Sequence, residues 1–121
     1  MGKKYSRARM RASKQHVVGD DVLTWRFHEE ATVEFDEAAD YYLEGALEVG
    51  YHFISVFDAG VDRIRRMPFL APTWPGRPDV RRLVLPRFPY SIVYTLERGE
   101  ILIVAVAHAK RQPGYWLGRL H

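Results

Sequence analysis

Cysteine is absent from the sequence, and this excludes both a disulfide framework and a metal site built from thiolates. A membrane-spanning helix needs about 20 apolar residues. The longest hydrophobic run covers only residues 101–107. No apolar segment follows the basic N-terminus, so a signal peptide is not indicated. These absences predict a soluble protein of the cytoplasm.

Histidine is present, but not in a pattern that holds a metal. The five histidines are scattered along the chain without the spacing of ligands: His16, His28, His52, His108 and His121. We therefore expect neither a metal nor another cofactor. The length of 121 residues suits one domain with a single hydrophobic core.

Basic residues are absent from one long part of the chain, and acidic residues are scarce in another. Residues 27–62 hold ten acidic side chains and no lysine or arginine, whereas the chain from Arg63 onward holds eleven basic side chains and three acidic ones. One interpretation is solvated helix faces followed by an ordinary basic half. The other is a polarised molecule whose basic surface binds a polyanion or an acidic protein.

The first 21 residues have neither helical nor strand periodicity and few groups to bury. We expect them to form a disordered or loosely attached basic tail ahead of one domain that spans residues 22–121. Two alternatives are an arm that binds nucleic acid and an artefact of start-codon choice.

Two amphipathic helices are predicted after a first strand over residues 22–27. The first helix begins at about His28 and places one apolar face at helical spacing: Ala31, Phe35, Ala38, Tyr42 and Ala46. The break between the helices is expected within residues 45–50. The second helix repeats the pattern before Pro68 ends it: Phe53, Phe57, Gly60, Ile64 and Met67. The proline-rich residues 68–78 that follow predict a stiff loop without regular structure.

Three strands are predicted in the last third of the chain, over residues 80–85, 90–96 and 101–107. The last two flank a short turn with a glycine, which predicts an antiparallel pair. The unbroken apolar run 101–107 is typical of a strand that is buried on both faces in the centre of a sheet. The predicted fold is α+β, with a helical hairpin on one face of an antiparallel sheet.

Several motifs, taken in order, resemble the ParE/RelE superfamily of bacterial type II toxins, which is known from plasmid stabilisation. They are Tyr41-Tyr42, Phe53 with Arg63-Ile64 and Pro68, Arg81-Arg82, RFPYSIVY (87–94) and AVAHAKRQPGYW (105–116). The resemblance covers about residues 23–119. It implies a small toxin that is held inactive by a cognate antitoxin in a toxin–antitoxin hetero-oligomer.

The superfamily has two activities, and the resemblance allows either. RelE-like members cleave mRNA on the ribosome, and ParE-like members inhibit DNA gyrase without hydrolysis. RNA cleavage needs a base, an acid and cations around the reacting phosphate. The candidate catalytic residues for a nuclease are His108, Lys110, Arg111 and Tyr115. The candidates for binding a target or RNA are Arg81, Arg82, Arg87, Arg111 and Trp116.

Five of these candidates also have a purely structural interpretation. His108 would be a histidine at a strand end that is hydrogen-bonded to the backbone. Arg81 and Arg82 would lie on an outward face of the sheet. Tyr115 and Trp116 would belong to a C-terminal lid packed on the sheet.

Two departures from the RNA-cleaving relatives favour the ParE-like mode. Ser91 stands where those relatives tend to carry an arginine, and the preceding loop has Arg77 with proline and glycine in place of extra lysines. We therefore predict a ParE-like toxin that binds gyrase. The alternatives are a RelE-like, ribosome-dependent mRNA endonuclease and a non-toxic binding module on the same fold.

The antitoxin is expected to cover the basic surface and the hydrophobic side of the helical hairpin. It would do so with a segment that folds on binding, as an amphipathic helix or as an added strand. Phe69, Leu70 and Trp74 in the proline-rich loop are the predicted exposed apolar side chains.

Overall fold

The structure, a computed structural model, describes residues 22–120. The predicted tail, residues 1–21, and His121 lie outside the described residues. Among the residues described, no helix is both long and apolar enough to span a membrane.

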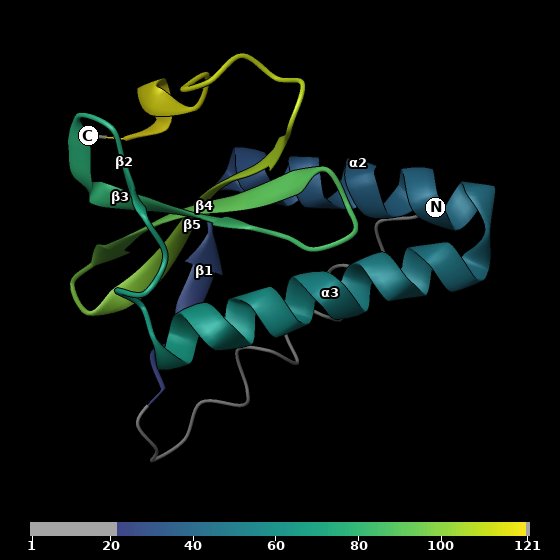
Figure 1. Cartoon of the computed structure of the whole chain (residues 1–121), viewed down its shortest axis with the longest axis horizontal. Helices are drawn as coiled ribbons and strands as arrows, with labels where there is room; N and C mark the ends of the chain where they lie inside the picture. Colours follow the sequence, from purple (N-terminus) through teal and green to yellow (C-terminus); the bar gives the residue numbers. More distant parts are fainter. Residues whose placement is uncertain (1–21, 121) are drawn as a thin grey trace.

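A five-stranded sheet forms the centre of the molecule, with the strand order β1-β5-β4-β3-β2 (Figure 1). The strands are β1 (Trp25–Phe27), β2 (Thr73–Trp74), β3 (Arg77–Val84), β4 (Tyr90–Glu97) and β5 (Glu100–His108). The strands β4 and β5 pair antiparallel, as predicted, and β5 lies inside the sheet between β1 and β4. The prediction of an α+β fold is confirmed.

The sheet is mixed, whereas the sequence predicted an antiparallel one. The first strand is shorter than residues 22–27 and pairs in parallel with β5, with Trp25 opposite Ile101. A short hairpin loop forces two strands to run antiparallel, but β1 and β5 are separated by most of the chain. The direction of β1 relative to β5 could therefore not be predicted from the local sequence.

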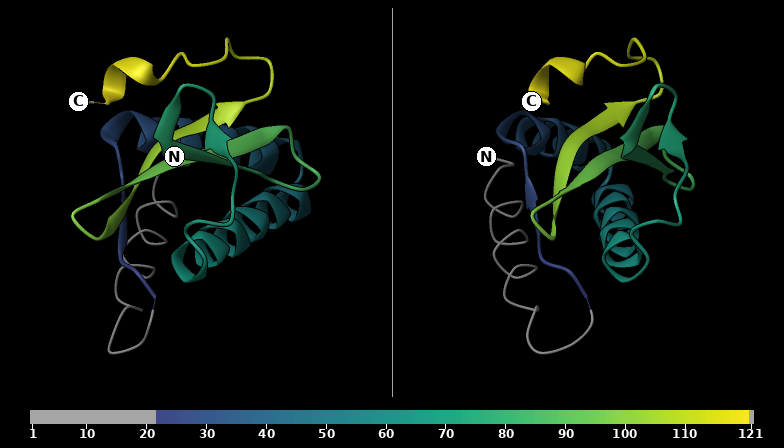
Figure 2. Two further views of the ribbon diagram at one scale, coloured as in Figure 1. Left: turned by 60° about the vertical axis from the view of Figure 1, so that its left-hand side comes forward. Right: turned by 90° about the vertical axis from the view of Figure 1, so that its left-hand side faces the viewer.

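Two helices cover one face of the sheet, α2 (Glu29–Gly45) and α3 (Leu47–Arg66) (Figure 2). Only Ala46 separates them, inside the predicted break. His28 caps α2, because its Nδ1 accepts a hydrogen bond of 3.1 Å from the backbone N–H of Glu30. The predicted apolar faces meet in an aromatic core, where the ring centroids of Phe35 and Phe57 are 4.5 Å apart.

The C-terminal segment covers the opposite face of the sheet (Figure 2). It inserts Trp116, which is 1% exposed, into a second cluster with Val80, Val93, Leu102 and Val104. This explains the unbroken apolar run of β5, since both faces of the strand are buried.

An irregularity in the pairing of β5 adds one residue to this second face. Tyr94 lies opposite Ile103 and Val93 opposite Ala105, which leaves Val104 as the extra residue of a β-bulge. Val104 and Ala105 both belong to the second cluster, whereas Ile103 and Val106 face the helices. Because of the bulge, β5 can direct apolar side chains toward the helices and toward the C-terminal segment along its whole length.

The prediction that residues 68–78 lack regular structure is wrong. They contain β2 and the start of β3, and Gly76 in the turn between them has φ +80°, which glycine adopts without strain. Trp74 is held by packing edge-to-face on Trp116, at 4.9 Å between ring centroids. A contact between residues so far apart in the chain cannot be seen as local periodicity. Phe69 and Leu70 are exposed, as predicted, but Trp74 is half-buried.

Gly60 lets α3 approach the sheet closely, which generates a stability prediction. A Cβ at this position would lie 3.0 Å from Leu85 Cδ2 and 3.1 Å from Ile92 Cδ1, both on buried side chains. We expect Gly60→Ala to lower the free energy of unfolding by about 1–2 kcal/mol, because overpacking outweighs the better helix propensity of alanine.

The matched control is Gly45→Ala, since a Cβ at Gly45 would meet nothing within 4 Å. That variant should keep or slightly raise the stability measured by urea unfolding. Equal effects of the two substitutions would show that close approach at Gly60 does not limit the packing of α3.

Candidate functional site

A small pocket lies between the sheet and the C-terminal segment, where β4 begins and β5 ends. Its volume is about 70 Å³. It collects five of the residues predicted from sequence: Arg82, His108, Arg111, Tyr115 and Trp116. Ser91 also lines it. Arg81, Arg87 and Lys110 do not.

His108 takes part in the turn that follows β5. Its Nδ1 accepts a hydrogen bond of 3.0 Å from the backbone N–H of Lys110, and its ring packs edge-to-face on Tyr90 at 4.9 Å. The structural interpretation of His108 describes this position. Of the two ring nitrogens, only Nε2 takes no part in this turn and can contact another molecule.

Arg111 and Tyr115 stack on each other at the mouth of the pocket. The guanidinium carbon of Arg111 is 3.7 Å from the centroid of the Tyr115 ring, a cation–π contact. Burial, followed by a hydrogen bond to Glu34, raises the pKa of Tyr115 well above its usual value. The Tyr115 hydroxyl therefore stays protonated at neutral pH and does not act as a base there.

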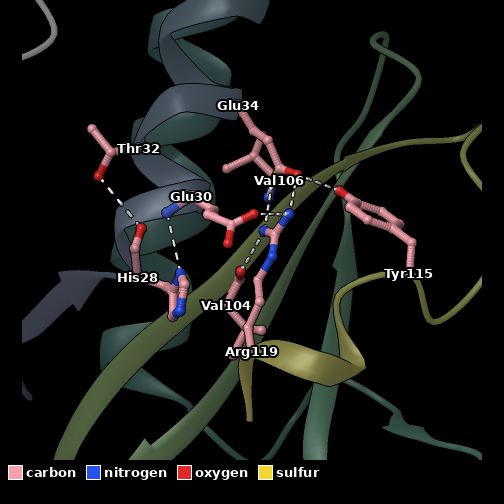
Figure 3. A network of polar contacts seen from close by, with 8 residues as sticks. All are labelled: His28, Glu30, Thr32, Glu34, Val104, Val106, Tyr115 and Arg119. Carbon is pink, nitrogen blue, oxygen red and sulfur yellow. Dashed lines mark hydrogen bonds and ion pairs between the residues drawn. The ribbon is translucent and has the colours of Figure 1, made fainter.

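Glu34 and Arg119 organise the region, although neither was among the predicted site residues. Arg119 donates two hydrogen bonds to the Glu34 carboxylate, at 3.0 and 2.8 Å, and the Tyr115 hydroxyl donates a third at 2.8 Å (Figure 3). In the sequence, Glu34 is one of the ten acidic side chains of residues 27–62. No local signal relates it to an arginine that lies 85 residues later.

The same pair also binds the backbone of β5 beyond the end of β1. The Val106 N–H donates to Glu34 at 2.9 Å, and Arg119 donates to the Val104 carbonyl at 2.9 Å (Figure 3). Burial alone would lower the pKa of Arg119, but the hydrogen bonds and the charge of Glu34 reverse this and raise it. Arg119 therefore stays charged while its side chain covers a strand edge.

Trp116 is not available to stack on a base. Its side chain is 1% exposed and packs against Trp74 and the second cluster. This position agrees with the structural interpretation, a C-terminal lid packed on the sheet, and the role of Trp116 in target binding stays a prediction.

The basic candidates do not share one surface. Neighbouring residues of a strand point to opposite faces, and accordingly Arg81 hydrogen-bonds the Phe69 and Ala71 carbonyls whereas Arg82 lies near Trp74 on the other face. Arg87 sits in the exposed turn after β3 with φ +70°. The predicted basic surface is therefore divided between the two faces of the sheet.

Comparison with known proteins identifies the family. The model of the family described as "ParE toxin of type II toxin-antitoxin system, parDE" matches residues 25–113. The chain belongs to the ParE toxin family. As a member of a type II toxin–antitoxin family, it has a cognate antitoxin as its implied partner.

A solved structure has the same fold as this ParE chain. This chain is similar to a chain of the chromosomal ParDE toxin–antitoxin system from P. aeruginosa, with a TM-score of 0.62 and 19% identity. The match covers 75% of this chain and all of the other. No curated protein matches the sequence.

The family match ends at Pro113, within the pocket lining. It therefore includes His108 and Arg111 but not Tyr115, Trp116 or Arg119, which hold the C-terminal segment on the sheet. No group of three or more acidic or histidine side chains within residues 22–120 is placed to bind a metal.

We expect a large loss of stability when one partner of the Glu34–Arg119 pair is removed. The two side chains are 13% and 10% exposed. Glu34→Ala should lower the free energy of unfolding by about 3 kcal/mol, because it leaves the largely buried Arg119 with only the exposed Glu30 carboxylate, at 3.5 Å, as a charged partner. The measurement is urea unfolding followed by circular dichroism.

Asp62→Ala provides the control, since it breaks an exposed pair with Arg66 at 2.9 Å. That change should cost at most about 1 kcal/mol. Similar losses in the two variants would show that the Glu34 network is no more important than a surface pair.

Proposed function

We propose that this ParE-family chain arrests growth by binding DNA gyrase without hydrolysis, and that its cognate antitoxin neutralises it in the bacterial cytoplasm. The observation that carries the choice is the size of the pocket. Pockets that bind small ligands measure about 300–1,000 Å³. The pocket that collects His108 and Arg111 measures about 70 Å³, well below this range.

The chemistry of the lining supports the same choice. In-line cleavage of RNA needs a base and an acid on opposite sides of a phosphate held by cations. Tyr115 keeps its proton, and His108 uses Nδ1 to bind the turn. Lys110 and Arg87 lie outside the pocket, which leaves Arg82 and Arg111 as its cations.

The alternative activity, ribosome-dependent cleavage of mRNA, is favoured by one observation. His108, Arg82 and Arg111 line the same pocket, although they come from different segments of the chain. A non-toxic binding module on this fold is the second alternative. Both are separated from gyrase binding by the same experiment.

The test is induced expression in bacteria with parallel measurements of growth, mRNA cleavage and plasmid supercoiling. The unaltered chain should stop growth and change supercoiling while mRNA stays intact. mRNA cut at defined positions would contradict the proposal and favour the nuclease. No effect on growth would favour the non-toxic module.

Two substitutions of His108 separate its chemical role from its structural one. His108→Asn keeps an acceptor for the Lys110 N–H, and His108→Ala removes it. Under the gyrase proposal, the folded asparagine variant should keep its effect on growth. A nuclease that uses the imidazole as acid or base would lose about 10²–10⁴-fold in both variants.

Arg111→Glu is the complementary variant, because Arg111 is exposed and stacked on Tyr115. Arginine is enriched among the residues that dominate protein interfaces, so this variant should weaken growth arrest more than His108→Asn does. Circular dichroism checks that each variant is folded. A harmless His108→Asn beside a fully toxic Arg111→Glu would contradict gyrase binding.

A further inference from the structure

The helical hairpin packs one face on the sheet and turns another away from it (Figure 2). On α2, Asp36, Asp40 and Leu43 follow one another at the spacing i, i+4 and i+7, so they share one side of the helix. This side lies next to α3, because a Cβ at Gly50 would overlap the Leu43 side chain.

The matching side of α3 carries Leu47, Tyr51 and Asp58. They lie seven and three residues before Ile54 and four residues after it, and Gly50 lies in the same row. Leu47 and Tyr51 are 63% and 61% exposed, and Asp58 is half-buried. We call the surface formed by these three residues with Asp36 and Asp40 the outer hairpin face.

Carboxylates from the two helices lie at similar levels on this face. The helices are antiparallel and joined at Ala46, and Asp36 lies ten residues before that joint whereas Asp58 lies twelve after it. Asp36 is 4% exposed. Buried carboxylates are costly unless hydrogen-bond donors or cations accompany them. The face therefore attracts positive charge.

Two further observations point to a cationic occupant. Residues 27–62 contain ten acidic side chains and no lysine or arginine. The Asp40 Oδ1 atom is buried and has no hydrogen-bond partner among residues 22–120. Arginine and lysine side chains would also suit the exposed Tyr51 and Leu47, since they stack on aromatic rings and cover apolar surface with their stems.

The chain itself contains a segment of this chemistry ahead of the described residues. Residues 1–19 include no acidic side chain and six basic ones: Lys3, Lys4, Arg7, Arg9, Arg11 and Lys14. The acidic and the basic extremes of the sequence are therefore complementary in charge.

The described chain starts close enough for this segment to reach the face. The Leu23 N–H donates to the Arg65 carbonyl at 3.4 Å, and Arg65 Nε donates to the Leu23 carbonyl at 2.9 Å. Arg65 lies seven residues after Asp58 on the same side of α3, which is about 10 Å along the helix. The nine residues from Lys14 to Leu23 span up to about 30 Å when extended. The basic segment is therefore long enough to pass Asp58 and reach Asp40.

Attachment to the same chain favours this occupant over others. A tethered segment meets its site at an effective concentration in the millimolar range. The tail of a second copy has the same charges but loses translational freedom on binding. A nucleic acid or an acidic protein would be repelled by the carboxylates of the face.

We propose that residues 3–14 bind to the outer hairpin face of their own chain, with lysine and arginine side chains against Asp36, Asp40 and Asp58 and over the Tyr51 ring. This contact is independent of the gyrase target and of the antitoxin.

The absence of cysteine from the sequence allows a direct test on the purified full chain. Met10→Cys carries a nitroxide spin label, and the amide signals of the isotope-labelled chain are recorded by NMR. Signals of Asp40, Tyr51 and Asp58 should be lost, and those of Gly76 in the β2–β3 turn should stay. Reduction of the nitroxide should restore the lost signals.

Charge variants of the face separate this contact from chance proximity. Asp40→Asn combined with Asp58→Asn should restore the Tyr51 signal in the spin-labelled chain. The matched control, Glu30→Gln combined with Glu37→Gln, removes the same charge from exposed residues on the other side of α2 and should leave the signal lost. Circular dichroism checks that both variants are folded.

Variants of the tail test the other partner without changing the helices. Replacing Arg7, Arg9 and Arg11 with glutamate should restore the lost signals, whereas replacing them with lysine should not. Salt should act like the glutamate variant, because the Debye length falls from about 8 Å at 0.15 M to about 3 Å at 1 M.

Three outcomes would overturn the proposal. Intact Tyr51 and Asp58 signals in the spin-labelled chain would show that the tail does not bind this face. Equal signal loss in the aspartate variant and its control would show that the carboxylates do not attract it. Equal loss when the spin label and the isotope label are on separate chains would assign the contact to a second copy.

Discussion

The ion pair between Glu34 and Arg119 is the interaction on which the arrangement of the molecule depends. The strand β1 ends at Phe27, so the side of β5 away from β4 has no strand beside it where β5 passes Val104 and Val106. Buried backbone groups without partners cost about 1–3 kcal/mol each. One carboxylate from α2 and one guanidinium from the C-terminal segment bind these groups and each other. The pair thus joins the two layers that cover opposite faces of the sheet.

The same constraint limits what the pocket can do chemically. Holding the C-terminal segment down buries Trp116 and directs the Tyr115 hydroxyl to Glu34, away from solvent. The residues that resemble nuclease groups are therefore largely occupied by structural contacts. What stays accessible is a dispersed set of arginines, the exposed side chains of the loop after α3 and the free edge of β3.

The uncovered edges of β5 and β3 differ in what lies against them. The uncovered part of β5 is closed by side chains of the chain itself, whereas β3 keeps an open edge between two apolar hollows. Exposed edges favour unwanted pairing, and short strands and prolines are the usual protection. Here Pro72 and Pro75 protect β2, but Leu83 and Val84 have no such neighbour before Pro86.

The sequence by itself determined the elements whose signals are local. Apolar spacing located both helices and their break, the run 101–107 identified a strand buried on both faces, and the short turn predicted the pairing of β4 with β5. The motifs through Trp116 also pointed to the family. Tertiary structure alone decided the parallel direction of β1, the β2–β3 turn among the prolines, and the Glu34–Arg119 pair. Each of these depends on groups that meet only after the chain has folded, so no periodicity or local propensity records them.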